Sequence, residues 1–186
     1  PRATAQLVTV DTMTLARAGA HPYRSAQALW LCSIVSKINS EPGSRFSRQD
    51  PMPGWREAMD EAGLPKREPL IGLWEASWGY AAGQRLVEEG LPDAIMCAND
   101  EVAVGLLHAF AEAGVSVPGD VSVAGFDDVP LAAYVGPGLT TVHQDFADLG
   151  RCAMEAVSQA LEGGSADTYV RPTRLVVRGS TGACAH

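Results

Sequence analysis

Short apolar segments alternate with amphipathic helices through most of the chain, and this alternation constrains the fold more than any other feature. The apolar segments are nearly continuous, which is typical of strands buried on both faces of a parallel sheet. Helices connect such strands and flank the sheet. The predicted strands are 68–74, 93–98, 121–126 and 139–145, and the predicted helices are 77–90, 99–114, 130–136 and 145–164. The expected fold is therefore α/β, a parallel sheet flanked by helices.

The first fifty residues follow this pattern less clearly. Residues 5–11 and 28–35 are plausible strands, and residues 36–53 have the composition of a loop. A further helix is predicted over 53–64, and a closing extended pair over 168–181. Ser77, Asp145 and either Asn99 or Asp100 are the predicted N-caps of the three longer helices, because their side-chain oxygens can accept the free N–H groups of a first turn.

Polar and aromatic side chains directly follow three of the predicted strands. Trp74 ends the first, Asn99 and Asp100 follow the second, and Asp127 and Asp128 follow the third. Open parallel sheets bind ligands beyond the carboxyl ends of their strands, so we expect a site at this edge. Adjacent residues at a strand end point to opposite sides, so the two aspartates are not expected to share a ligand. Asp128 is expected to cap the turn that follows.

Composition and residue spacing argue against several classes of function. The net charge is −8 and the 14 Lys and Arg residues are scattered, which argues against direct binding of nucleic acid. No segment has the length and hydropathy of a membrane span or of a signal peptide. The four cysteines lack metal-ligand spacing, so we expect reduced thiols, no metal and no cofactor. His108 and His143 have no nucleophile at motif spacing, so we do not expect an enzyme.

Four segments occur in a characteristic order: GWREAMDEAGL, LWEASWGYAAGQRL, a run from DAIMCAND through VAGFDD to LTTVHQD, and RLVVRGST. Together they span about two-thirds of the chain. This series resembles the effector-binding core of the lactose/galactose-repressor family of bacterial transcription regulators. The resemblance implies a periplasmic-binding-protein-like fold of type I, in which two α/β lobes hold a small effector between them.

The resemblance also implies roles for individual residues. The implied ligand-binding positions are Trp74, Asn99, Asp127 and Gln144, and the implied dimer interface is formed by Val104, Leu107 and Tyr134. Asp and Asn oxygens suit the hydroxyls of a sugar, and a flat indole suits its C–H face. The alternatives are an N-cap role for Asn99, capping near Pro130 for Asp127, a core position for Trp74 and an ordinary strand position for Gln144.

The chain departs from the family near its start. Pro51 stands where the family usually has an arginine, and residues 12–50 do not follow the family pattern. We expect a divergent or truncated segment near the lobe junction (1–50), the C-terminal lobe (51–142), a crossover and helix contributed to the N-terminal lobe (143–171), and a closing strand and tail (172–186).

The implied function is that of a cytoplasmic sensor that binds a small sugar-like effector and acts as a homodimer. It would control operator DNA through a headpiece that is not expected in this chain, and it would have no contact with a membrane. Two other interpretations stay open. One is a sugar-binding solute receptor of the same fold, and the other is a truncated repressor remnant without function.

Overall fold

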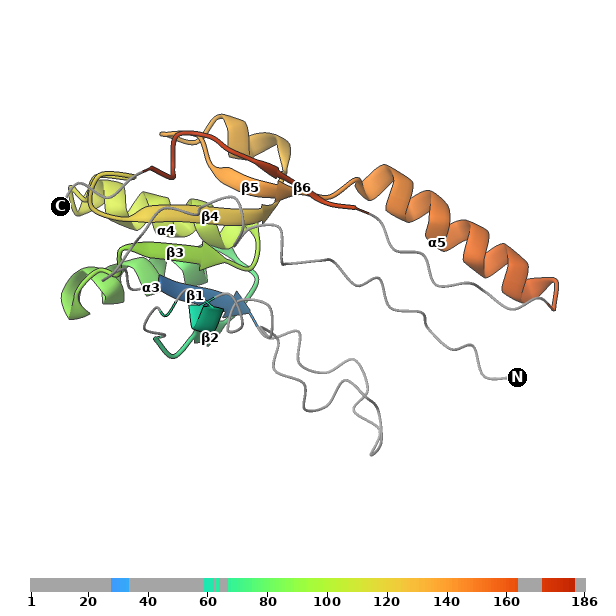
Figure 1. The fold of residues 1–186 in the computed structure, drawn as a ribbon, viewed down its shortest axis with the longest axis horizontal. Helices are drawn as coiled ribbons and strands as arrows, with labels where there is room; N and C mark the ends of the chain where they lie inside the picture. The colour runs from blue at the N-terminus through green and yellow to red at the C-terminus, as the bar shows by residue number, and fades with distance from the viewer. Residues whose placement is uncertain (1–27, 34–58, 62, 64–66, 164–171, 183–186) are drawn as a thin grey trace.

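The computed structural model describes residues 28–33, 59–61, 63, 67–163 and 172–182. Six strands form one sheet with the order β2-β1-β3-β4-β5-β6 (Figure 1). They are β1 Ala28–Ser33, β2 Leu70–Gly72, β3 Ala94–Cys97, β4 Ser122–Asp127, β5 Thr140–His143 and β6 Arg174–Val176. The first five are parallel, and β6 runs antiparallel to β5. The expected α/β class with a largely parallel sheet is confirmed.

Three helices and a short 3-10 turn connect the strands. They are α3 Ala76–Glu89, α4 Asp100–Glu112, η1 Pro130–Ala133 and α5 Phe146–Leu161. Helix α4 packs on β3 and β4, and α3 packs against α4. Helix α5 instead extends away from the sheet, and Cys152 is its one buried residue (Figure 1). The prediction that residues 143–171 contribute to another lobe remains a prediction.

Glycines allow α3 and α4 to pack closely. A Cβ added to Gly105 would overlap the carbonyl oxygen of Ala76, and one added to Gly79 would overlap that of Val102. Both helix backbones therefore approach more closely than side chains would permit. Beneath them, the core is made of fully buried residues that include Ile95, Leu106, Phe110, Val121, Val123 and Leu139.

Most predicted elements after residue 68 are present, with shifted ends. Helix α3 begins after Glu75 rather than Ser77, and Ser77 Oγ donates a hydrogen bond to the Glu75 carboxylate at 3.2 Å. The predicted helix 130–136 is the single 3-10 turn η1. Within the predicted closing pair 168–181, the described residues supply β6, which pairs with β5, and residues 168–171 lie outside the described residues. The predicted strand 5–11 and most of the predicted helix 53–64 lie outside the described residues, although 59–61 are helical.

The segment after β6 is hydrogen-bonded to the sheet where β4 and β5 begin. Ser180 is fully buried, and its hydroxyl donates to the Val123 carbonyl at 2.6 Å and accepts from the Thr140 N–H at 2.8 Å. Its backbone bonds to Val123 and Gly138. These contacts satisfy backbone groups that would otherwise be buried without partners. Within the part of the chain described, no helix is long and apolar enough to cross a membrane.

Candidate functional site

The carboxyl ends of the parallel strands bring the four predicted ligand-binding residues to one edge of the sheet. Trp74 follows β2, Asn99 follows β3, Asp127 ends β4, and Gln144 follows β5. Asp127 is paired in register with His143, the residue before Gln144. The strand order therefore places Asp127 and Gln144 next to each other, as the contact between their side chains confirms.

Asn99 caps α4 and connects that helix to the end of β2. Its Oδ1 accepts a hydrogen bond from the Val102 N–H at 2.8 Å, and its Nδ2 donates to the Trp74 carbonyl at 3.4 Å. Only 4% of Asn99 is exposed. The predicted N-cap role is thus confirmed, whereas contact between Asn99 and a ligand remains a prediction.

Two tryptophans lie near the end of β2: Trp74 in the loop that follows it, and Trp78 in α3. Trp74 is the more exposed of the two. Its side chain is 42% exposed, which leaves ring surface open to a ligand. Trp78 instead lies over Gly72, where an added Cβ would overlap its indole ring, and it packs against the core. Trp78 therefore has a packing role.

Asp127 and Gln144 form the polar centre of this edge. Gln144 Nε2 donates to Asp127 Oδ1 at 2.7 Å. Burial raises the pKa of Asp127 to about 6; the Gln144 hydrogen bond opposes this effect, and the negative charges of Asp100 and Glu101 add to it. Among the residues described, no donor contacts the second carboxylate oxygen, Oδ2. A ligand hydroxyl could donate to that oxygen.

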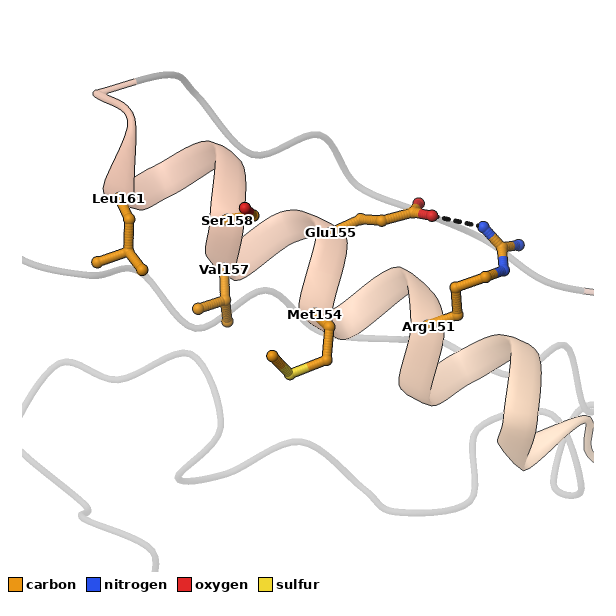
Figure 2. Close-up of a pocket in the computed structure, with 6 residues that line it drawn as sticks. All are labelled: Arg151, Met154, Glu155, Val157, Ser158 and Leu161. Carbon is orange, nitrogen blue, oxygen red and sulfur yellow. Dashed lines mark hydrogen bonds and ion pairs between the residues drawn. The ribbon is translucent and has the colours of Figure 1, made fainter.

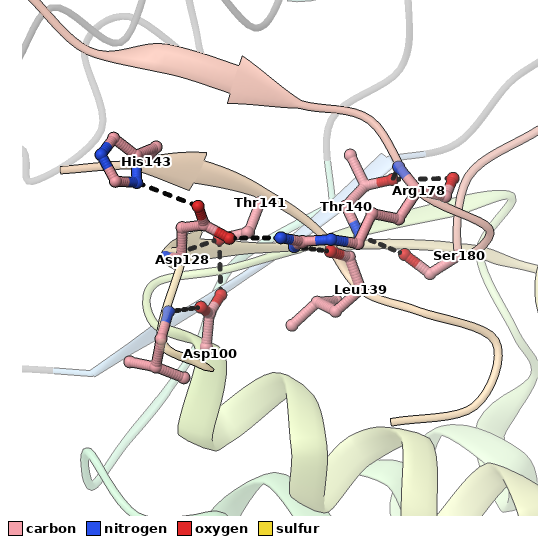
Figure 3. A network of polar contacts seen from close by, with 9 residues as sticks. Asp100, Asp128, Leu139, Thr140, Thr141, His143, Arg178 and Ser180 are labelled. Atoms are coloured by element: carbon pink, nitrogen blue, oxygen red, sulfur yellow. Dashed lines mark hydrogen bonds and ion pairs between the residues drawn. The ribbon is translucent and has the colours of Figure 1, made fainter. Parts of the chain in front are cut away.

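Asp100 is a buried carboxylate close to Asp127. It is completely buried; Thr141 Oγ1 donates to its Oδ1 at 2.6 Å, and the Val129 N–H donates to its Oδ2 at 2.9 Å (Figure 3). A Cβ on Gly125 would overlap Oδ1, so the glycine makes room for the carboxylate. Burial raises the pKa of Asp100, and these two hydrogen bonds oppose that effect. Sequence reasoning considered Asp100 as a possible cap and as one of the polar residues after a strand, but not that it joins α4 to the β4–η1 loop and to β5.

Asp128 has different side-chain partners from Asp127, as expected for neighbours at a strand end. Arg178 Nη2 donates to its Oδ1 at 2.6 Å, and His143 Nδ1 lies 2.9 Å from its Oδ2 (Figure 3). Burial raises the pKa of Asp128, but the hydrogen bonds and charges of Arg178 and His143 outweigh it, so the pKa lies below the usual range. The prediction that Asp128 caps the next turn is wrong, because η1 has no side-chain cap and both Asp128 carboxylate oxygens are engaged by Arg178 and His143.

Two aspartates at the end of β4 adopt backbone conformations that favour glycine. Asp127 has φ 115° and Asp128 has φ 55°. Such values are uncommon for other residues, and aspartate tolerates the left-handed region better than most. The Asp128 N–H is bound by Thr141 Oγ1 at 3.3 Å, and both Asp128 carboxylate oxygens are engaged. The contacts of Asp128 therefore hold the backbone that orients Asp127.

The three predicted dimer residues differ in exposure. Tyr134 is 85% exposed and Val104 is half-buried, whereas Leu107 is 6% exposed and belongs to the core cluster. Leu107 also lines a shallow hollow of about 360 Å³ between α4 and the loop after η1. The part these residues play in a dimer remains a prediction.

A hollow of about 440 Å³ lies along α5 (Figure 2). Its lining comes from this one helix and consists of Arg151, Met154, Glu155, Val157, Ser158 and Leu161. Arg151 and Glu155 bond to each other at 2.7 Å rather than converging on a ligand. Binding sites usually combine enclosure with convergent polar groups, so the edge around Asp127 is the better candidate. No cluster of metal-binding side chains occurs in the described segments.

Comparisons with known proteins agree with this fold. A family described as the periplasmic binding protein-like domain matches residues 33–181. Catabolite control protein A of Priestia megaterium is 35% identical over 154 residues, which are 80% of this chain and 46% of that protein. The chain spans less than half the length of the first curated relatives that it matches.

Two solved structures extend the comparison. A dimeric Lac repressor with an 11-residue C-terminal deletion superposes with a TM-score of 0.77 at 27% identity, over 94% of this chain and 61% of that one. A regulator from Arthrobacter sp. FB24, solved in complex with lactose, has a TM-score of 0.73 at 25% identity, over 96% of this chain and 67% of that one. These relatives are transcription regulators rather than enzymes, in agreement with the expectation from sequence.

Proposed function

Since this chain belongs to the periplasmic binding protein-like domains of the lactose/galactose-repressor family, we propose that it is the effector-sensing part of a transcription regulator. It binds a small polar ligand, of the sugar class, at the carboxyl edge of its sheet. The observation that carries this proposal is the Asp127 carboxylate, which Gln144 orients and whose second oxygen has no partner among the described residues.

The neighbouring groups support the same ligand class. The exposed face of Trp74 suits the C–H surface of a sugar ring, and the carboxylate accepts from a hydroxyl. The lactose complex of the Arthrobacter regulator supports a sugar as the first class to test. Asn99 and Gln144 complete the predicted set.

Binding controls transcription through linkage. A ligand that contacts this edge and an opposing lobe favours one arrangement of the lobes, and it can shift the equilibrium only by its difference in affinity for the two arrangements. The regulator acts as a cytoplasmic homodimer through Val104, Leu107 and Tyr134, and it binds operator DNA through a headpiece outside this chain. The dimeric Lac repressor supports this assembly.

A thermal-shift screen against monosaccharides, disaccharides, polyols and nucleosides tests the proposal, because a ligand that binds only the folded state raises the melting temperature. We expect a shift with one chemical class, loss of that shift in Asp127→Ala, and retention in Glu112→Gln at the far end of α4. Retained binding in Asp127→Ala would remove Asp127 from the site. A cooperative melt without any shift would contradict the sensor function, and the absence of a cooperative melt would favour the remnant.

A further inference from the structure

Carboxylates are concentrated at the edge of the sheet where the ligand is proposed to bind. At least one acidic residue lies within three residues of the end of each of β2, β3, β4 and β5. The acidic residues near these ends are Glu75, Asp100, Glu101, Asp127, Asp128 and Asp145. The negative charges of Asp100 and Glu101 act on Asp127, which shows that they are near it. Asp100 is buried and Asp128 is paired with Arg178, so the carboxylate that this edge presents to a ligand is that of Asp127, and the charges of Asp100 and Glu101 add to its negative potential.

The positive charges close to this edge are already engaged. Arg178 is bound to Asp128 and to the Leu139 carbonyl, at 2.6 and 2.8 Å, and His143 also contacts Asp128. Arg151, on α5, is held by Asp148 and Glu155. Arg174 is exposed, but it lies on β6, on the other side of β5 from Asp127. Within the described ranges, no cation contacts the free oxygen of Asp127.

A ligand group that faces the open oxygen of Asp127 must consequently donate a hydrogen bond. An ionised carboxylate only accepts, and one of the two N–H groups of Gln144 Nε2 already donates to Asp127. A carboxylate or phosphate group on the ligand would face like charges in a partly desolvated place, where repulsion is weakly screened. A hydroxyl meets no such opposition, and an ammonium group would be attracted.

We propose that this edge selects its ligand by charge, accepting neutral or amino sugars and rejecting sugar acids and sugar phosphates of the same shape. This inference rests on the proposed sensor function, because it names the chemical class that the sensor takes. Asp127 is the residue that sets the preference.

The first experiment measures the charge of the edge without any ligand. Trp74 fluorescence, taken as the difference between the parent chain and Trp74→Phe, is quenched with caesium, iodide and neutral acrylamide. We expect caesium to quench Trp74 at least twofold better than iodide after correction for their intrinsic efficiencies. Asp127→Asn should reduce that ratio, whereas Glu112→Gln, at the far end of α4, should leave it unchanged. Equal or better quenching by iodide would overturn the proposal.

The second experiment measures selection directly by calorimetry with matched probes. The pairs are galactose with galacturonate, glucose with glucose 6-phosphate, and ribose with ribose 5-phosphate, with glucosamine as the cationic probe. We expect any neutral sugar that binds to do so at least 10-fold more tightly than its anionic partner, and Asp127→Asn to narrow that gap. An anion that binds as tightly as its neutral partner would overturn charge selection and leave the sensor function intact. Failure of every probe, with caesium preference intact, would overturn the proposed selection among sugars, and the thermal-shift screen would then decide whether the sensor function also fails.

Discussion

The surroundings of the Asp127 carboxyl disfavour its ionised form. Its pKa is raised to about 6 by burial and by neighbouring carboxylates, so ionisation destabilises the fold as pH rises from about 4 through 6. We predict that Asp127→Asn stabilises the protein by about 2 kcal/mol at pH 7.5 and by much less at pH 4.5, since each pH unit of raised pKa corresponds to about 1.4 kcal/mol. Urea unfolding at both pH values measures the change in the free energy of unfolding. An equal change at pH 7.5 and pH 4.5 would contradict the prediction.

Arg178 stabilises the same loop from the C-terminal segment. We predict that Arg178→Met lowers the free energy of unfolding by about 2–3 kcal/mol at pH 7, because the largely buried Asp128 carboxylate loses its strongest partner. The pKa of Asp128 is lowered, so this stabilisation is present above the usual aspartate pKa and disappears as pH falls through the lowered value.

A double-mutant cycle with Asp128→Asn tests that pair. Asparagine tolerates the positive φ of position 128, so the variant removes charge with little added backbone strain. We expect a coupling energy above about 1 kcal/mol at pH 7 that shrinks in acid. Additive losses at pH 7 would show that the two side chains act independently.

At the scale of elements, the close approach of α3 and α4 depends on glycine. We predict that Gly105→Ala lowers stability by about 3 kcal/mol, because the new methyl group would overlap the backbone of Ala76 and must push the helices apart. Gly150→Ala in α5 is the matched control: nothing lies within 4 Å of its added Cβ, and alanine favours a helix by about 1 kcal/mol. Thermal unfolding should move the two variants in opposite directions, and similar shifts would rule out steric contact as the cause.

Local patterns predicted most elements, but not how distant segments combine. Apolar runs and caps such as Asn99 and Asp145 depend on neighbouring residues, so they could be read directly from the sequence. The insertion of β1 between β2 and β3 depends on pairing between distant segments. Likewise, Asp128 and Arg178 are 50 residues apart, and no local signal indicates that they meet. The capping role of Asp128 was predicted wrongly because both of its carboxylate oxygens are engaged by residues distant in sequence, His143 and Arg178.

At the scale of the whole molecule, a substitution of Tyr134 tests self-association directly. Its side chain is 85% exposed beside Leu131, which is 54% exposed. We predict that Tyr134→Asp converts the proposed dimer into a monomer, because a carboxylate there would be buried without a partner in the interface. Light scattering measures the mass, and Val87→Asp on α3 is the control. A mass unchanged by Tyr134→Asp would exclude this surface from the interface.

The buried position of Ser180 has a consequence for the order of events during synthesis. The Val123 and Thr140 N–H groups receive their partners from Ser180, which the ribosome adds 40 residues after Thr140. Until then, the start of β4 and β5 presents unpaired backbone beside an apolar core, which chaperones and proteases recognise in partly folded chains. The last stage of folding therefore waits for the C-terminal segment, so translation that stops before Ser180 should yield a nascent chain marked for degradation rather than a shorter stable domain.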